Sequence, residues 1–144
     1  MDLGLKLKRI HDVMEKNANR EVERLDVTFA QHHVLMYLLH HKDEAVSLKE
    51  LEKHFGVAQS TMAGIISRLE DKNLVYSFRE PSDKRIKKAA LTEKGMEVSE
   101  KSRKNMKAGV KVMTSRMTSE EAGELNRLLD ILYETIRDDQ NKEV

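Results

Sequence analysis

Residues 60–68 carry short and hydrogen-bonding side chains whose types and spacing suit contact with a polar surface. They are Ser60, Thr61, Gly64, Ser67 and Arg68. Hydroxyl groups can bond phosphates or base edges, an arginine can donate two hydrogen bonds to one guanine, and small side chains let a backbone approach closely. This pattern is typical of a helix that reads the major groove of DNA. Small polar residues also cover many solvent-facing helices that bind nothing.

A second group of candidate residues, at 79–88, is cationic. It consists of Arg79, Lys84, Arg85, Lys87 and Lys88, interrupted by Glu80 and Asp83, so this stretch carries five minus two, or +3. The whole chain has a formal net charge of only +1, so the positive charge is concentrated here. Such a loop can lie along a minor groove, where the potential is negative. We expect Asp83 to stay near Arg85 and to orient it. The alternative is an ordinary solvated loop.

Two helices, expected at 47–55 and 58–72, would position the first group. In the second helix the apolar residues recur at i, i+3, i+4 and i+7, which predicts a buried face opposite the polar one. These residues are Met62, Ile65, Ile66 and Leu69. The two helices are joined by Gly56-Val57, and Gly56 fits a left-handed C-cap. Their size and spacing indicate a helix-turn-helix.

The cationic group would be held by a β-hairpin that follows directly. After Asn73, which tolerates the left-handed conformation, the apolar period changes to that of strands. Residues 74–78 and 86–91 are predicted strands, and Glu80-Pro81-Ser82-Asp83 is a turn pattern. A hairpin placed after a helix-turn-helix has the layout of a wing.

Further helices are expected on both sides of this unit, at 3–24, 28–41, 92–117 and 118–139. Several of the helices begin with residues that can cap free amides: Thr28 with Gln31, Ser47 with Glu50, Thr92 alone, and Thr118 with Glu121. The predicted fold is therefore mostly α with a small β-hairpin wing, a winged helix-turn-helix. We expect a single domain of residues 1–144, with a DNA-binding lobe at 28–91.

The composition argues against several other classes of protein. Cysteine is absent, which excludes disulfides and thiolate metal sites. The sequence has no glycine-rich phosphate loop, nucleophile elbow or His-Glu-Xaa-Xaa-His pattern, so an enzyme is not expected, nor is a cofactor. It also has no apolar run of ~18 residues and no secretion signal. A cytoplasmic protein that does not cross a membrane is the expectation.

Several motifs along the chain resemble one known family. Asp83-Lys84-Arg85 is followed, after five residues, by Leu91-Thr92-Glu93-Lys94-Gly95. Weaker matches are Thr28-Phe29-Ala30-Gln31, Ser60-Thr61, Arg68-Leu69-Glu70 and Lys72-Asn73-Leu74-Val75. With these motifs the chain resembles the MarR family of bacterial winged-helix regulators over essentially its whole length.

The chain departs from the pattern of that family at a few positions. Ala58 stands where a capping residue is common, and loss of a cap costs ~1 kcal/mol of helix stability. Asn73 replaces a common glycine. Ser77 and Phe78 stand where basic residues are frequent, so a phosphate contact from that strand depends on Arg79 instead.

The resemblance implies a transcriptional regulator, expected to be a repressor, that binds double-stranded DNA as a homodimer. The helices of residues 1–27 and 92–144 would interlock in the dimer, and their apolar stripes agree with this. A twofold dimer presents two reading helices to half-sites ~34–36 Å apart, in a pseudo-palindromic operator. The alternative is that these helices pack within a monomer.

The resemblance also implies a small-molecule effector that releases DNA by favouring a different spacing of the lobes. The candidate lining residues are His11, Met14, His33, Tyr37 and Met106. Two alternatives stay open: a winged helix that binds a protein, and a metal-responsive regulator that uses histidines. His33 and His41 are eight residues apart, too far along one helix to share an ion, and no metal ligands are assigned.

Overall fold

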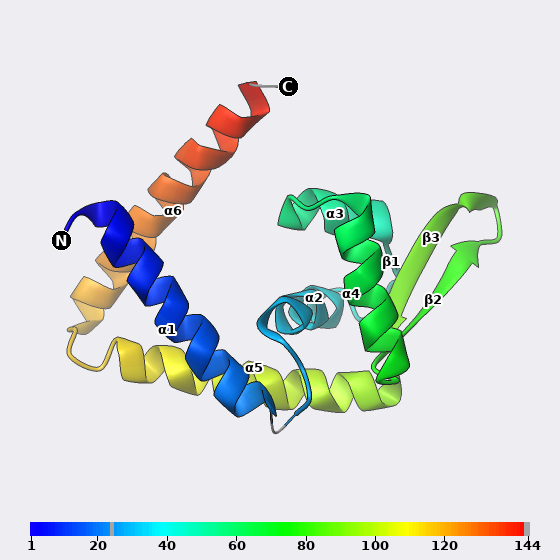
Figure 1. Ribbon diagram of the computed structural model, residues 1–144, viewed down its shortest axis with the longest axis horizontal. Coiled ribbons are helices and arrows are strands. Elements are labelled where there is room, and N and C mark those ends of the chain that lie inside the picture. Colours follow the sequence, from blue (N-terminus) through cyan, green and yellow to red (C-terminus); the bar gives the residue numbers. More distant parts are fainter. Residues whose placement is uncertain (24, 143–144) are drawn as a thin grey trace. The chain divides into compact units, whose positions relative to one another are not determined.

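The computed structural model describes the backbone of residues 1–23 and 25–142 and the side chains of residues 1–16 and 25–142. The chain divides into two compact units, Met1–Met106 and Lys107–Val144. The elements of the first unit, seen in Figure 1, are α1 (Leu3–Glu23), α2 (Phe29–His40), β1 (Val46–Ser47), α3 (Leu48–Phe55), α4 (Gln59–Asp71), β2 (Val75–Glu80) and β3 (Asp83–Leu91). Helix α5 (Glu93–Met113) begins in the first unit and ends in the second, which also holds α6 (Ser119–Lys142).

The three strands form one antiparallel sheet in the order β1-β3-β2. Strands β2 and β3 make the predicted hairpin, but they are longer than expected and leave only residues 81–82 between them. The register shifts between Arg79 and Glu80, near the turn. Strand β1, which pairs Val46 with Ala89, was not predicted, because two residues are too few to show an alternating pattern.

The core of the first unit lies among α2, α3, α4 and the inner face of the sheet. Its central side chains, all with at most 1% of their surface exposed, are Leu35, Leu51, Met62, Ile66 and Leu69. Each such side chain stabilises the fold by about 1.5–3 kcal/mol relative to an exposed one. Helix α2 is buried around much of its circumference.

The predicted caps are present with one correction. The hydroxyl of Thr28 accepts from the amide of Gln31, and the Gln31 side chain accepts from the amide of Thr28, both at 3.2 Å. Ser47 accepts from the amide of Glu50 at 3.0 Å, but the prediction of a reciprocal box was wrong. The carboxylate of Glu50 instead accepts a hydrogen bond from the hydroxyl of Tyr37 on α2.

The two left-handed positions that the sequence predicted are present, and Asp26 is a third that it did not predict. Gly56, after α3, has φ +62°, and Asn73, after α4, has φ +60°. Gly56 is the C-cap of α3, three residues before α4 begins, and Asn73 follows the C-cap of α4, so the two turns flank that helix.

The second unit is helical, and α6 has no fully buried residue. The predicted box of Thr118 and Glu121 opens it, with hydrogen bonds of 3.0 and 3.1 Å. Helix α5 ends at Met113, four residues before the predicted end, because the chain turns at residues 114–117. Among the residues that the structure describes, no helix has the length and apolar character needed to cross a membrane.

Candidate nucleic-acid interface

Helix α4 has the two faces that its sequence predicted. Met62, Ile66 and Leu69 are buried and Ile65 is half-buried in the core. On the opposite face the exposed candidates are Ser60, Thr61, Ser67 and Arg68. Hydroxyls and a guanidinium are therefore presented to solvent along the helix.

Gly64 lies half-buried between these exposed side chains. A Cβ atom built there would lie 3.5 Å from a terminal nitrogen of Arg68, which is an ordinary contact distance. The glycine is therefore not required by the backbone. Because Gly64 has no side chain, a partner could approach the backbone of α4 closely beside Arg68.

The beginning of α4 has no side-chain cap. Ala58 occupies the N-cap position with extended backbone and makes no side-chain hydrogen bond. The first amides of α4 consequently remain available to solvent or to an anion such as a phosphate.

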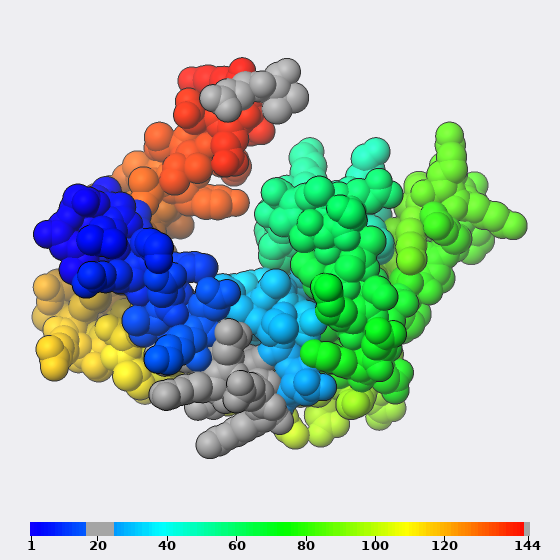
Figure 2. All heavy atoms as spheres, viewed as in Figure 1, coloured from blue at the N-terminus to red at the C-terminus, as the bar shows by residue number. Residues whose placement is uncertain are grey.

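The wing divides its cations between two faces. Side chains alternate along a strand, and the face that bears the buried Val75 and Ala89 packs toward α4. Because Arg79 pairs with Lys87 in the register, the cations of that face are Arg79, Arg85 and Lys87. The other face carries Lys84 and Lys88. In Figure 2 the yellow-green atoms of the hairpin project beside the green atoms of α4.

Arg85 is held in place but remains open to solvent. Its Nε and terminal nitrogen donate to the two carboxylate oxygens of Asp83, each at 3.0 Å. These bonds lower the pKa of Asp83 below its ordinary value. The Arg85 side chain is nevertheless 91% exposed. The expected proximity of the two residues is thus present, and Asp83 orients a cation that projects outward.

The outer face of the wing holds a feature that sequence reasoning missed. Tyr76 and Phe78 are exposed and stacked, with ring centroids 6.1 Å apart, and Ile86 on the same face is also exposed. Lys88, opposite Phe78, forms an ion pair with Glu80 at 2.7 Å. Tyr76 and Phe78 are two residues apart in a predicted strand, and this spacing could have shown that both rings lie on one face.

Ser77 is turned the other way. Its hydroxyl donates to the carboxylate of Glu70 on α4, so this side chain fastens the sheet to the helix. The position where the related family often has a basic residue is therefore used for packing within this chain.

The five candidate effector residues fall into separate groups. His11 and His33 both pack edge-on against a residue that sequence reasoning missed, Phe29, with ring centroids 6.2 and 4.4 Å away. Tyr37 instead stacks on His41 at 4.3 Å and packs against His54. Met14 and Met106 are half-buried.

The histidines do not combine into a metal-ligating cluster in the part of the chain that the structure describes, where no group of three histidine, aspartate or glutamate side chains could hold an ion.

The helix pair α3–α4 followed by the β2–β3 hairpin defines a winged helix-turn-helix protein. The MarR family profile matches residues 25–86. The chain is 33% identical over 98 residues, 68% of its length, to the HTH-type transcriptional regulator YdgJ of Bacillus subtilis, and this match spans 57% of YdgJ. It is 24% identical over 130 residues to the HTH-type transcriptional repressor IacR of Pseudomonas putida, covering 90% of this chain and 77% of IacR.

Solved structures agree with this assignment at the level of the fold. MepR of S. aureus in its DNA complex superposes with a TM-score of 0.88 at 22% identity, covering 94% of this chain and 99% of MepR. MarR gives a TM-score of 0.86 at 21% identity, over 99% of this chain and 95% of MarR. The chain belongs to the MarR family of winged-helix transcriptional regulators.

Proposed function

We propose that this regulator binds double-stranded DNA sequence-specifically as a homodimer, with α4 in the major groove and the wing against the adjacent minor groove. The observation that carries the proposal is the exposed hydrogen-bonding face of α4 beside an outward-pointing Arg85. MepR, which has the same fold, is described in a complex with DNA, and this supports the same partner here.

The two parts of the surface have different tasks in this proposal. Ser60 and Thr61 lie in the first turn of α4, the part of a recognition helix that reaches base edges. Arg68 is the candidate for a bidentate contact with guanine. Arg79, Arg85 and Lys87 supply charge to phosphates and the minor groove, and such contacts position the protein without reading sequence.

Exposed apolar side chains on the terminal helices support the homodimer. On α1 they include Leu3, Ile10 and Val13, and on α6 they include Leu128, Leu129 and Ile136, each at least 43% exposed. Rows of this kind leave water when two copies of a chain interlock. Two copies of α4 would then face half-sites about one helical turn apart.

We further propose that the regulator is a repressor released by a small molecule. The repressor role is supported by a relative, IacR, which is named a transcriptional repressor. The cluster of His11, Phe29 and His33 joins α1 to α2, so a ligand inserted there would act on both helices. A ligand that binds one arrangement of them better shifts the population toward it.

The test is a gel-shift titration on a pool of random duplexes at low and moderate salt. DNA binding through phosphates must weaken steeply as salt rises. The alternative of a protein-binding winged helix is favoured by the exposed Tyr76, Phe78 and Ile86 of the outer wing face. An absence of duplex binding at both salt concentrations would support that alternative and contradict the proposal.

A further inference from the structure

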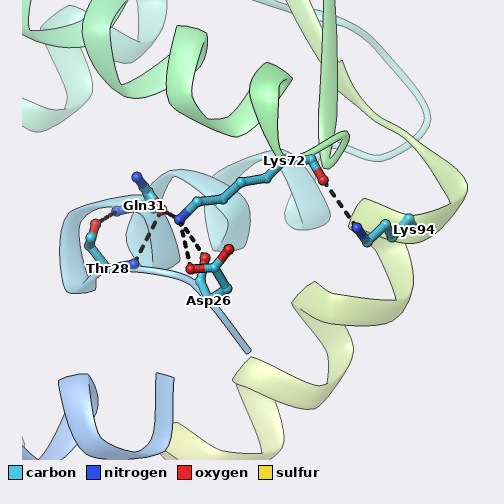
Figure 3. A network of polar contacts seen from close by, with 5 residues as sticks. All are labelled: Asp26, Thr28, Gln31, Lys72 and Lys94. Carbon is cyan, nitrogen blue, oxygen red and sulfur yellow. Dashed lines mark hydrogen bonds and ion pairs between the residues drawn. The ribbon is translucent and has the colours of Figure 1, made fainter. Parts of the chain in front are cut away.

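The C-terminal end of α4 is tied to the turn between α1 and α2. The ammonium group of Lys72, the C-cap residue of α4, donates to the backbone carbonyl of Asp26 and, at 2.9 Å, to the side-chain oxygen of Gln31. The Asp26 carboxylate is 3.9 Å away. Figure 3 shows the Lys72 side chain reaching from α4 across to Asp26 and Gln31. The Lys72 side chain therefore bonds to residues that lie 41 and 46 positions earlier in the sequence.

The same end of α4 is also tied to the beginning of α5. The carbonyl of Lys72 accepts a hydrogen bond from the ammonium group of Lys94 at 3.2 Å. The next carbonyl, of Asn73, accepts from the Thr92 hydroxyl at 2.7 Å. The chain leaves the winged helix-turn-helix toward its N- and C-terminal helices through these two segments, and both are bonded to one turn of α4.

Lys72 is poorly placed to contact DNA itself. Its side chain is only 25% exposed, and its ammonium group already faces three oxygen atoms. Lys72 follows the last residue of α4, and its ammonium group reaches toward the α1–α2 turn and the first turn of α2. Enclosing a charged group is costly unless its partners are well placed. Here the partners are Asp26 in the α1–α2 turn and Gln31 in the first turn of α2.

We propose that Lys72 is a positioning residue for DNA recognition: it fixes the end of α4 to the α1–α2 turn, so that the orientation of α4 follows the position of that turn. This inference rests on the proposed DNA binding by α4. It assigns to Lys72–Asp26–Gln31 the task of transmitting a displacement of α1 to the reading helix. Gln31 adds rigidity because the same oxygen atom also accepts from the amide of Thr28, at the start of α2.

The test compares Lys72→Met, which removes the ammonium group at similar length, with Lys72→Arg, which keeps a cation. Lys101→Met is the matched control, since Lys101 is a 62% exposed lysine on α5 outside the network. We expect Lys72→Met to lower the affinity for a selected duplex by about 3- to 30-fold, the range for residues that modulate a coupled site. Lys101→Met should change it less than about twofold, and Lys72→Arg should restore most of the loss.

Two further readouts separate positioning from other roles. The dependence of affinity on salt should keep the wild-type slope in Lys72→Met, because a lost phosphate contact would reduce that slope by about one. Since the chain has no cysteine, Ala30→Cys and Ala63→Cys allow paired spin labels on α2 and α4, measured in dimers with excess unlabelled protein. The distance distribution should broaden in Lys72→Met and not in Lys101→Met.

The outcomes are distinguishable. Unchanged affinity in Lys72→Met, an unchanged label distribution, or a salt slope reduced by about one would each overturn the positioning role. If the wild-type protein bound no duplex, the proposed function would fall, while the label distances would still test whether Lys72 holds α4. Should Lys72→Met not fold, Lys72→Gln, which has a donor but too little reach, replaces it in all measurements.

Discussion

At the scale of single residues, a substitution of Arg85 tests whether the wing contributes to DNA binding. This guanidinium is oriented by Asp83 and almost fully exposed, so Arg85→Ala removes an external charge and no packing. We expect weaker binding to nearly all duplexes and a salt slope smaller by about one, because a backbone or minor-groove contact carries little sequence information. Arg103→Ala, which removes an arginine paired with Glu100 on α5, is the control. If Arg85→Ala bound duplexes as tightly as wild type at low and moderate salt, the wing would not be part of the DNA interface.

A second residue-scale prediction concerns His32, which is buried in α2 and contacts the hydroxyl of Ser102 on α5 through Nδ1. Burial, and then the charge of His33, lower the pKa of His32 from 6.5 to about 4. Between these values the unfolded chain binds the proton and the folded protein does not. The contribution of His32 to stability is therefore complete above about pH 6.5 and is lost as the pH falls toward 4, amounting to at most about 3 kcal/mol.

Urea unfolding from pH 4 to pH 7 measures this contribution. His32→Gln should show a flatter dependence of the free energy of unfolding on pH than wild type, and His40→Gln, at an exposed position of the same helix, should not. Because all three proteins share the exposed carboxylates that also titrate at low pH, their comparison isolates His32. Parallel curves for His32→Gln and wild type would show that His32 is not held neutral by the fold.

At the scale of elements, Gly95 fixes how closely α5 approaches the end of α4. A Cβ atom at this position would lie 1.8 Å from the backbone carbonyl oxygen of Leu74. A backbone carbonyl cannot rotate away as the end of a flexible side chain could. We expect Gly95→Ala to lower the free energy of unfolding by about 1–3 kcal/mol or more. Gly109→Ala, in the same helix with nothing within 4 Å of the new atom, should leave stability equal or raise it by up to about 1 kcal/mol. Equal denaturation midpoints for the two variants would contradict the close packing.

How far the elements follow from the sequence depends on how local their determinants are. The faces of α4 were predictable because the apolar residues at 62, 65, 66 and 69 repeat at helical spacing. The reciprocal cap at Ser47 was predicted wrongly because Glu50 finds a partner on α2, Tyr37. The network of Lys72 could not be predicted, because its acceptors lie more than 40 residues away and a lysine near a helix end has many ordinary roles.

At the scale of the whole molecule, the proposal requires two chains. Leu129 on α6 is 43% exposed within one chain, and an interlocked dimer would cover it. Leu129→Glu should shift the protein toward monomer in sedimentation equilibrium and weaken duplex binding, because a buried unpaired carboxylate is costly. Asn141→Glu, an exposed position on a different side of α6, should stay dimeric. A wild-type protein that sediments as a monomer at micromolar concentration would contradict the homodimer.

The binding groups and the dimer together determine what kind of operator is expected. In the proposed complex, short polar side chains on α4 read bases, the cations of the wing contribute affinity, and a twofold axis repeats both. Variants of α4 should therefore change which duplexes are chosen, whereas variants of the wing or of α6 should change how tightly any duplex is held.

The most direct measurement is selection of bound duplexes from a random pool, made in parallel with the wild-type protein and with a variant combining Ser60→Ala, Ser67→Ala and Arg68→Ala. The wild-type protein should enrich two inverted half-sites with centres about 10 base pairs apart. The variant should still bind DNA with the wild-type salt dependence but should lose that motif or enrich another. If both proteins enriched the same motif, or the wild-type protein enriched none, α4 would not be the element that reads the sequence.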